Sequence, residues 1–94
     1  YLLLALEIAS GLSGIENKLE PTAQTTGNGY EDQDHQAIPT DLASAVALAR
    51  ESDLMAEVLG PDLLEMLIQQ SEREIEFVAN QVTPVEIERY LESF

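Results

Sequence analysis

The only histidine of the chain lies in an acidic segment, EDQDHQ, and is the first candidate for site chemistry. His35 and its neighbours Glu31, Asp32 and Asp34 carry the nitrogen and oxygen ligands that divalent cations use. Calcium loops, however, need a fixed ligand order and a glycine at the sharp turn, and this segment has neither. With one histidine and no cysteine, a zinc cluster or a Cys–His pair cannot be assembled. The preferred interpretation is a solvated acidic loop, and no metal site is predicted.

A second group of carboxylates follows one face of a predicted long helix. Glu72 and Glu76 are four residues apart, so their charges repel on an exposed helix, and Arg73 compensates in part. They project opposite the apolar stripe of that helix, where carboxylates ordinarily keep a protein soluble. We therefore predict no catalytic residue on this face. Its members are Glu65, Glu72, Glu74 and Glu76.

The charge of the chain excludes two classes of partner. Its 94 residues include 18 Asp and Glu against 4 Lys and Arg, a net charge of −14. This excess repels phosphate groups, so neither nucleic acid nor an anionic membrane surface is expected to bind. The apolar stretch Leu2–Leu12 is interrupted by Glu7 and Ser10 and falls well short of the ~20 residues that cross a bilayer.

The strongly apolar opening segment predicts a core helix over residues 1–13. It is apolar nearly all round, and such a helix must be enclosed by other parts of a protein. Gly11 and Gly14 place its end near Leu12–Ser13. Residues 14–39 carry prolines and glycines without a sustained period and predict one long loop.

Helix signals dominate residues 40–94, so the predicted fold class is mainly α, with about four to five helices. Thr40 or Asp41 caps the first helix of this part, and a short helix follows from Ser52 to Gly60. Pro61 opens a long helix, and Thr83-Pro84-Val85-Glu86 has the capping-box pattern that opens the last one. Two apolar stripes result: Leu64, Leu67, Ile68, Ser71, Ile75, Val78 and Val82 on the long helix, and Ile87, Tyr90, Leu91 and Phe94 on the last.

The order of these segments resembles a known family. GLSGIENKLEP and the ending around Val82-Thr83-Pro84 are the most specific parts of a pattern that covers essentially the whole chain. It resembles the C-terminal segment of the catalytic domain of glutamine synthetase, or of the similar γ-glutamyl ligases that act on other amines. The resemblance implies that residues 1–94 are the helical C-terminal part of an α+β catalytic domain.

The resemblance also implies an activity for the parent protein. It would be a cytoplasmic ligase of nitrogen metabolism that depends on ATP and Mg²⁺ (or Mn²⁺). In that family γ-glutamyl phosphate forms first, and ammonia or an amine then displaces the phosphate. The metal ligands and the ATP site would lie upstream of Tyr1, so residues 1–94 would hold no cofactor and would be inactive alone. The opening helix would lie beneath the active-site sheet, with the remainder of its own catalytic domain as partner.

Two further expectations follow from the resemblance. Some bacterial members carry an adenylylated tyrosine in an Asn-Leu-Tyr-Asp-Leu-Pro loop, and Tyr30 falls near that position. Gly29 replaces the leucine and no Leu-Pro follows, so an ordinary loop tyrosine is preferred over a regulatory one. The family's C-terminal tail joins subunits across stacked rings of a homo-oligomer. The stripe Ile87, Tyr90, Leu91 and Phe94 is therefore expected either at a subunit contact or packed back onto the long helix of its own chain.

A different class of function stays open: a stand-alone acidic helical interaction module without catalysis. Its basis is the complete set of caps on the later helices and the apolar stripes, which suit a partner helix. In either case the opening helix is expected to find cover, against the later helices or against another copy of the chain. The residues concerned are Leu3, Leu4, Leu6 and Ile8.

Overall fold

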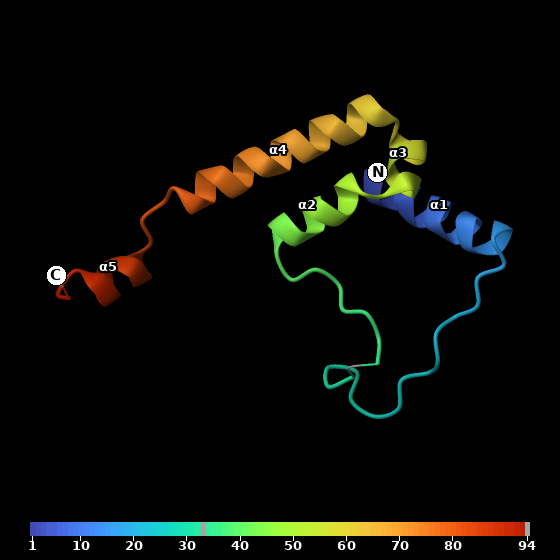
Figure 1. Cartoon of the computed structure of the whole chain (residues 1–94), viewed down its shortest axis with the longest axis horizontal. Coiled ribbons are helices and arrows are strands. Elements are labelled where there is room, and N and C mark those ends of the chain that lie inside the picture. Colours follow the sequence, from blue (N-terminus) through green and yellow to red (C-terminus); the bar gives the residue numbers. More distant parts are fainter. Residues whose placement is uncertain (33, 94) are drawn as a thin grey trace.

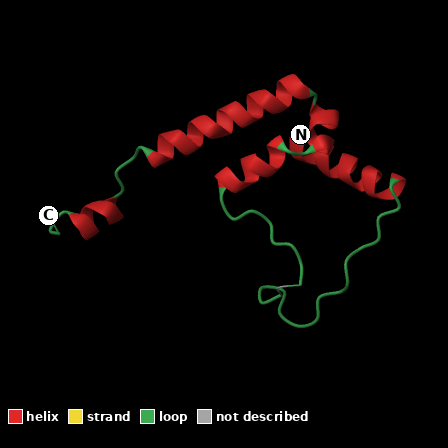
Figure 2. Cartoon of the chain, in the orientation of Figure 1, coloured by secondary structure: helices red, strands yellow, loops and turns green. Residues whose placement is uncertain are grey.

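The computed structural model describes residues 1–32 and 34–93 and is helical throughout its regular structure (Figure 2). No strand occurs in those residues, so the prediction of a mainly α fold with four to five helices and one long loop is confirmed. None of the helices is long and apolar enough to cross a membrane within this described part. Figure 1 labels the helices as α1 (Leu2–Glu16), α2 (Leu42–Arg50), α3 (Asp53–Leu59), α4 (Pro61–Ala79) and α5 (Pro84–Tyr90).

The core of the chain lies where α2 and α3 pack against the first half of α4. Val46 of α2 is buried there against Leu64 and Ile68 of α4. Burial of each such side chain stabilises the packing by roughly 1.5–3 kcal/mol. Ile75, in the second half of α4, still packs against this core, but the rest of the predicted stripe has no such cover. Val78 near the end of α4 and Val82 beyond the helix are both exposed.

The helices do not enclose one another. The radius of gyration is 18.7 Å, whereas a compact domain of this length has about 12 Å. The accessible surface is 8592 Å², against about 5,400 Å² for a compact chain of this mass. Figure 1 shows α5 standing away from the cluster of α2, α3 and α4. The chain therefore leaves much of its apolar surface uncovered.

Helix α1 extends further than the sequence predicted. It runs through Gly11 and Gly14 to Glu16, so the long loop begins at Asn17 and the predicted end near Leu12–Ser13 is wrong. The reason is energetic: an interior glycine costs only about 1 kcal/mol relative to alanine. A well-formed cap further along the chain outweighs that cost.

This cap is built from the residues directly after α1. The backbone N–H of Leu19 donates to the Gly14 carbonyl at 2.9 Å, and that of Lys18 donates to the Ile15 carbonyl at 3.1 Å. This is the Schellman pattern, which requires a left-handed residue after the cap. Lys18 takes that conformation with a φ of 51°. The Asn17 side-chain amide adds a bond to the Ser13 carbonyl at 2.8 Å.

The other predicted caps are confirmed by the structure. Asp41, not Thr40, caps α2: one carboxylate oxygen accepts the backbone N–H of Ser44 and the other its hydroxyl, both at 2.8 Å. These two bonds hold the pKa of Asp41 below its ordinary value of 3.8. At α5, Thr83 and Glu86 form the complete capping box, and its bonds likewise lower the pKa of Glu86.

The cap at Asp41 makes the start of α2 sensitive to acid. Because the pKa of Asp41 is lowered on folding, its stabilising contribution is present above 3.8 and is lost as the pH falls through the folded value. Asparagine caps helices about as well and does not titrate. In the Asp41→Asn variant we therefore expect carbon chemical shifts of residues 42–46 to stay helical where those of the wild type drift toward coil. A parallel drift in both proteins on acidification would contradict this role.

Candidate functional site

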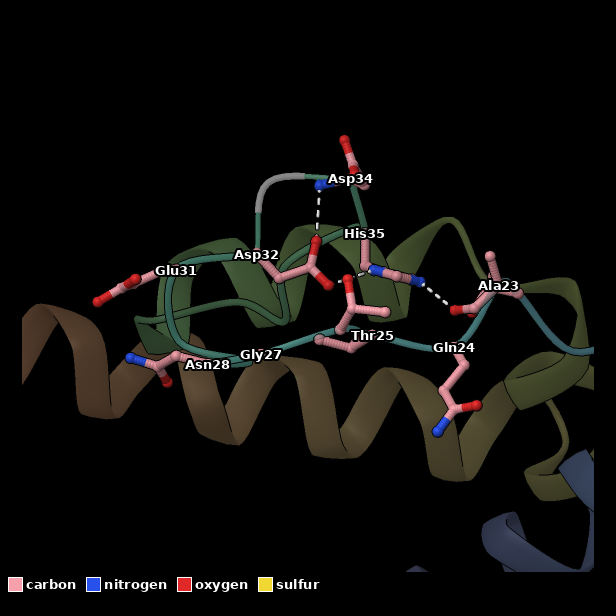
Figure 3. Close-up of a pocket in the computed structure, with 11 residues that line it drawn as sticks. Ala23, Gln24, Thr25, Gly27, Asn28, Glu31, Asp32, Asp34 and His35 are labelled. Atoms are coloured by element: carbon pink, nitrogen blue, oxygen red, sulfur yellow. Dashed lines mark hydrogen bonds and ion pairs between the residues drawn. The ribbon is translucent and has the colours of Figure 1, made fainter.

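The loop between α1 and α2 folds back on itself and, in the described part of the chain, curves around an open hollow. The hollow measures about 730 Å³ and is lined only by loop residues between Thr22 and His35. Figure 3 shows the His35 ring, on one side of the loop, facing the segment around Ala23 and Thr25 on the other side. The loop thus contains a closed turn within a longer connection.

His35 closes this turn with both of its ring nitrogens. Nδ1 lies 2.8 Å from Oδ2 of Asp32, and Nε2 lies 2.9 Å from the carbonyl oxygen of Ala23. The His35 side chain is 28% exposed, the Asp32 side chain only 14%. Glu31 and Asp34 are exposed, as the prediction of a solvated acidic loop has it, whereas Asp32 and His35 are partly buried because the ring bridges two parts of the chain.

Asp32 is held as a carboxylate by its neighbours. Hydrogen bonds from the Thr25 hydroxyl and the Asp34 backbone N–H, the latter at 2.8 Å, lower the pKa of Asp32 below its ordinary value. The bond to His35 acts in the same direction. At neutral pH the oxygen that faces the histidine ring is consequently a charged acceptor.

The arrangement does not resemble a metal centre. Within residues 1–32 and 34–93, no group of three or more His, Cys, Asp and Glu side chains is placed to hold a metal ion. Both nitrogens of His35 already contact oxygen acceptors. The Glu31 side chain points away from the ring in Figure 3.

Tyr30 belongs to the same loop and is fully exposed. Its backbone N–H donates to the Asn28 side-chain oxygen at 3.1 Å, and the backbone N–H of Glu31 donates to the Asn28 carbonyl at 3.0 Å. Asparagine commonly stabilises a tight turn in this way. The turn presents the tyrosine ring to solvent, and whether Tyr30 is a site of modification stays a prediction.

Two glutamates on the acidic face of α4 form ion pairs with Arg50, a residue that the sequence analysis did not consider. Arg50, at the end of α2, lies 2.7 Å from Glu72 and 3.7 Å from Glu65. The sequence alone assigns charge compensation on this face to Arg73. Each partner is about half exposed, and such pairs contribute at most about 1 kcal/mol. The ion pairs link α2 to α4, so Glu65 and Glu72 have a structural role in helix packing.

The apolar stripe of α5 is uncovered in its described part. Ile87, Tyr90 and Leu91 are all exposed, Leu91 to 74%. Phe94, the last member of the predicted stripe, lies outside the described residues. Packing of the stripe onto α4 of the same chain does not provide cover here, and a role in subunit contact stays a prediction.

Comparison with known proteins places these features in a family. Residues 1–90 match the family described as glutamine synthetase, catalytic domain. No solved structure gives a significant match.

Three relatives illustrate the similarity. The chain is 32% identical to a glutamine synthetase of Thermotoga maritima over 97% of this chain and 22% of the relative. It is 34% identical to a glutamate–isopropylamine ligase of a Pseudomonas species, over 98% of this chain and 20% of that relative. It is 31% identical to type-1 glutamine synthetase 2 of Dictyostelium discoideum, over 98% of this chain and 18% of that relative. The chain thus spans about a fifth of the length of these relatives. The match over residues 1–90 confirms the resemblance seen in the sequence: the chain belongs to the glutamine synthetase catalytic-domain family.

Proposed function

We propose that residues 1–94 are the helical C-terminal part of a catalytic domain that joins glutamate to ammonia or another amine. The family match over residues 1–90 carries this proposal. The parent protein would be a cytoplasmic, ATP-dependent ligase of nitrogen metabolism. The chain alone would have no activity, because the groups that bind substrates would lie in the rest of the domain.

The exposed apolar surface of α1 supports the proposal that other parts of a larger domain cover this helix. This helix contacts α3 but contains no buried residue. Leu3, Leu4 and Ile8 are among its exposed side chains. A helix that is apolar nearly all round is stable only when it is enclosed. The proposal assigns that enclosure to the remainder of the catalytic domain.

The cofactor site belongs to the same remainder in this proposal. The described residues contain no group of three or more His, Cys, Asp and Glu side chains that could hold Mg²⁺ or Mn²⁺. The proposal therefore assigns the metal, and ATP with it, to the rest of the domain. These groups would supply phosphoryl transfer to the glutamate carboxylate elsewhere in the protein. The residues of this chain would support that site through the packing of α1.

The coding sequence upstream of Tyr1 tests the proposal without any assay. We expect it to encode an Asn-Pro dipeptide directly before Tyr1, preceded by strands bearing arginine and glutamate. A start codon close before Tyr1 would instead favour the stand-alone helical interaction module. The uncovered stripe of α5 is the observation that favours this second candidate.

Within the proposed enzyme, the stripe of α5 is expected to join subunits of a homo-oligomer of stacked rings. Deletion of residues 90–94 from the full-length protein should then lower its mass in solution, as measured by light scattering. Leu91→Glu should act in the same direction, since a carboxylate in an apolar contact is costly. Ser93→Glu adds the same charge outside the stripe and should leave the assembly intact. Should the mass stay constant while thermal stability drops, the helix braces its own subunit instead.

A further inference from the structure

We propose that Asn28 is a site of spontaneous deamidation, at which the backbone nitrogen of Gly29 attacks the side-chain amide carbon of Asn28. The hydrogen bonds of the turn at residues 28–31 favour this attack, whereas the bonds next to the other asparagines of the chain oppose it. The inference is independent of the proposed enzymatic function, because it rests on this turn alone.

The reaction needs neither a cofactor nor an enzyme. The backbone nitrogen of Gly29 loses its proton to water and forms a bond to Cγ of Asn28. The bond between Cγ and Nδ2 then breaks, and the amide nitrogen takes up a proton from water and leaves as ammonia. A cyclic imide remains, and water opens it at either of its carbonyl carbons. The product is aspartate when the new bond to Cγ breaks, and isoaspartate when the original peptide bond breaks.

The side-chain oxygen of Asn28 accepts a hydrogen bond that holds the reacting atoms on one turn. The backbone N–H of Tyr30 donates to Oδ1 of Asn28 at 3.1 Å. The ring that this bond closes runs through Cγ of Asn28 and the backbone nitrogen of Gly29. The same N–H faces the oxygen on which negative charge develops during the attack, and a preorganised donor at such an oxygen stabilises the transition state.

A second hydrogen bond acts on the attacking nitrogen. The backbone N–H of Glu31 donates to the carbonyl oxygen of Asn28 at 3.0 Å. This carbonyl and the nitrogen of Gly29 belong to one conjugated peptide group, so a donor at the oxygen draws electron density from the nitrogen. The N–H of Gly29 therefore loses its proton more readily. Within residues 1–32 and 34–93, no acceptor bonds this N–H.

The surroundings of the turn leave the reacting atoms open to water. Asn28, Gly29 and Tyr30 are all exposed. Gly29 has no side chain to crowd its nitrogen, and a Cβ placed there would meet nothing within 4 Å. Figure 3 shows the Asn28 side chain well apart from the His35 ring. Water can therefore reach both the attacking nitrogen and the imide.

The other two asparagines of the chain lack a free attacking nitrogen. The backbone N–H of the residue after Asn17 donates to the Ile15 carbonyl at 3.1 Å. The backbone N–H of the residue after Asn80 donates to the Val78 carbonyl, also at 3.1 Å. Both nitrogens are thus occupied by bonds at the end of a helix, and the structure singles out Asn28.

Deamidation changes the turn in charge and in length. An aspartate at position 28 adds a carboxylate next to the acidic residues Glu31 and Asp32. An isoaspartate also adds a methylene group to the main chain, so the N–H groups of Tyr30 and Glu31 lose register with their acceptors at position 28. The turn that presents Tyr30 to solvent is remodelled in this form.

Tryptic mapping of the 94-residue chain tests the assignment with internal controls. Trypsin cleaves after Lys and Arg and leaves the three asparagines on separate peptides, residues 1–18, 19–50 and 74–89. During incubation in neutral buffer we expect peptide 19–50 to gain about one dalton, as an amide becomes a carboxyl group, and to separate into aspartate and isoaspartate forms. Its rate should exceed that of the other two peptides by at least about tenfold. Equal rates on all three peptides, or no gain on peptide 19–50, would overturn the proposal.

Variants of the turn test the attacking nitrogen and its helper bond. Gly29→Ala adds a methyl group that meets nothing within 4 Å but crowds the nitrogen, so the rate should fall by about tenfold. Tyr30→Pro removes the N–H that donates to Asn28 and should also slow the reaction. Tyr30→Phe keeps that N–H and should match the wild type. An unchanged rate in either of the first two variants, or a slower one in the third, would contradict the role of the turn.

Asn28→Asp is the control for the identity of the reacting side chain. It carries a carboxylate from the start, so its peptide 19–50 should show no gain in mass. A gain that persists in this variant would place the reaction on a glutamine of the same peptide and would overturn the assignment to Asn28.

Discussion

Replacement of Leu4 by glutamate is expected to convert the isolated chain from a self-associated form into a monomer. Leu4 is 58% exposed on α1, beside the exposed side chains of Leu3 and Ile8. A contiguous exposed apolar surface of this kind favours association with another apolar surface. In the absence of the rest of a catalytic domain, we expect α1 of a second copy of the chain to provide that surface. Burial of a leucine is worth about 1.5–3 kcal/mol, and a buried carboxylate adds a further penalty.

The association constant should therefore fall by about a hundredfold or more, as measured by sedimentation equilibrium. Ser10→Glu provides the control, because it adds the same charge to the same helix at an exposed polar position. It should leave association nearly unchanged. A wild-type chain that sediments as a monomer at all concentrations would remove the idea, since α1 would then need no cover.

Ile68→Ala is expected to detach α2 and α3 from α4. Ile68 is 4% exposed and is one of three buried side chains, with Val46 and Leu64, in the core of the described residues. Truncation of a buried isoleucine costs about 2–5 kcal/mol, through reduced burial and the cavity left behind. Small domains have a total stability of only about 5–15 kcal/mol, so this cost is a large fraction of it. Urea unfolding followed by circular dichroism should show a markedly lower midpoint.

Met66→Ala is the matched control for this prediction. Met66 lies on the same helix but is 57% exposed, so its truncation leaves no cavity. We expect its unfolding free energy to stay within about 0.5 kcal/mol of the wild type. Equal effects of the two substitutions would mean that α4 is not held by the packing of its first half.

The helix starts were predictable from sequence because their causes are local. Asp41, Ser52 and Thr83 each accept a backbone N–H three residues ahead, and such bonds depend on residue type and spacing alone. The end of α1 was not predictable in this way. It depends on Lys18 in a left-handed conformation, which sequence reasoning assigns first to glycine.

The contacts of the loop and of α4 were also beyond the sequence, for a different reason. His35 bonds a backbone carbonyl twelve residues away, and every residue type carries such an acceptor. Arg50 meets Glu72 across 22 residues, which requires the packing of α2 on α4 to be known. Residue chemistry identified His35 and the glutamates as polar features, and only the fold supplied their partners.

The measurement that tests the central claim most directly is an assay of the full-length protein beside the isolated chain. Each is given glutamate, ATP and Mg²⁺ with ammonia, isopropylamine or hydroxylamine, and the γ-glutamyl product and released phosphate are quantified. The account predicts amine-dependent product from the full-length protein with at least one acceptor and none from residues 1–94 alone. Product formed by the pure isolated chain, or no ATP-dependent ligation by the full-length protein with any acceptor, would contradict it.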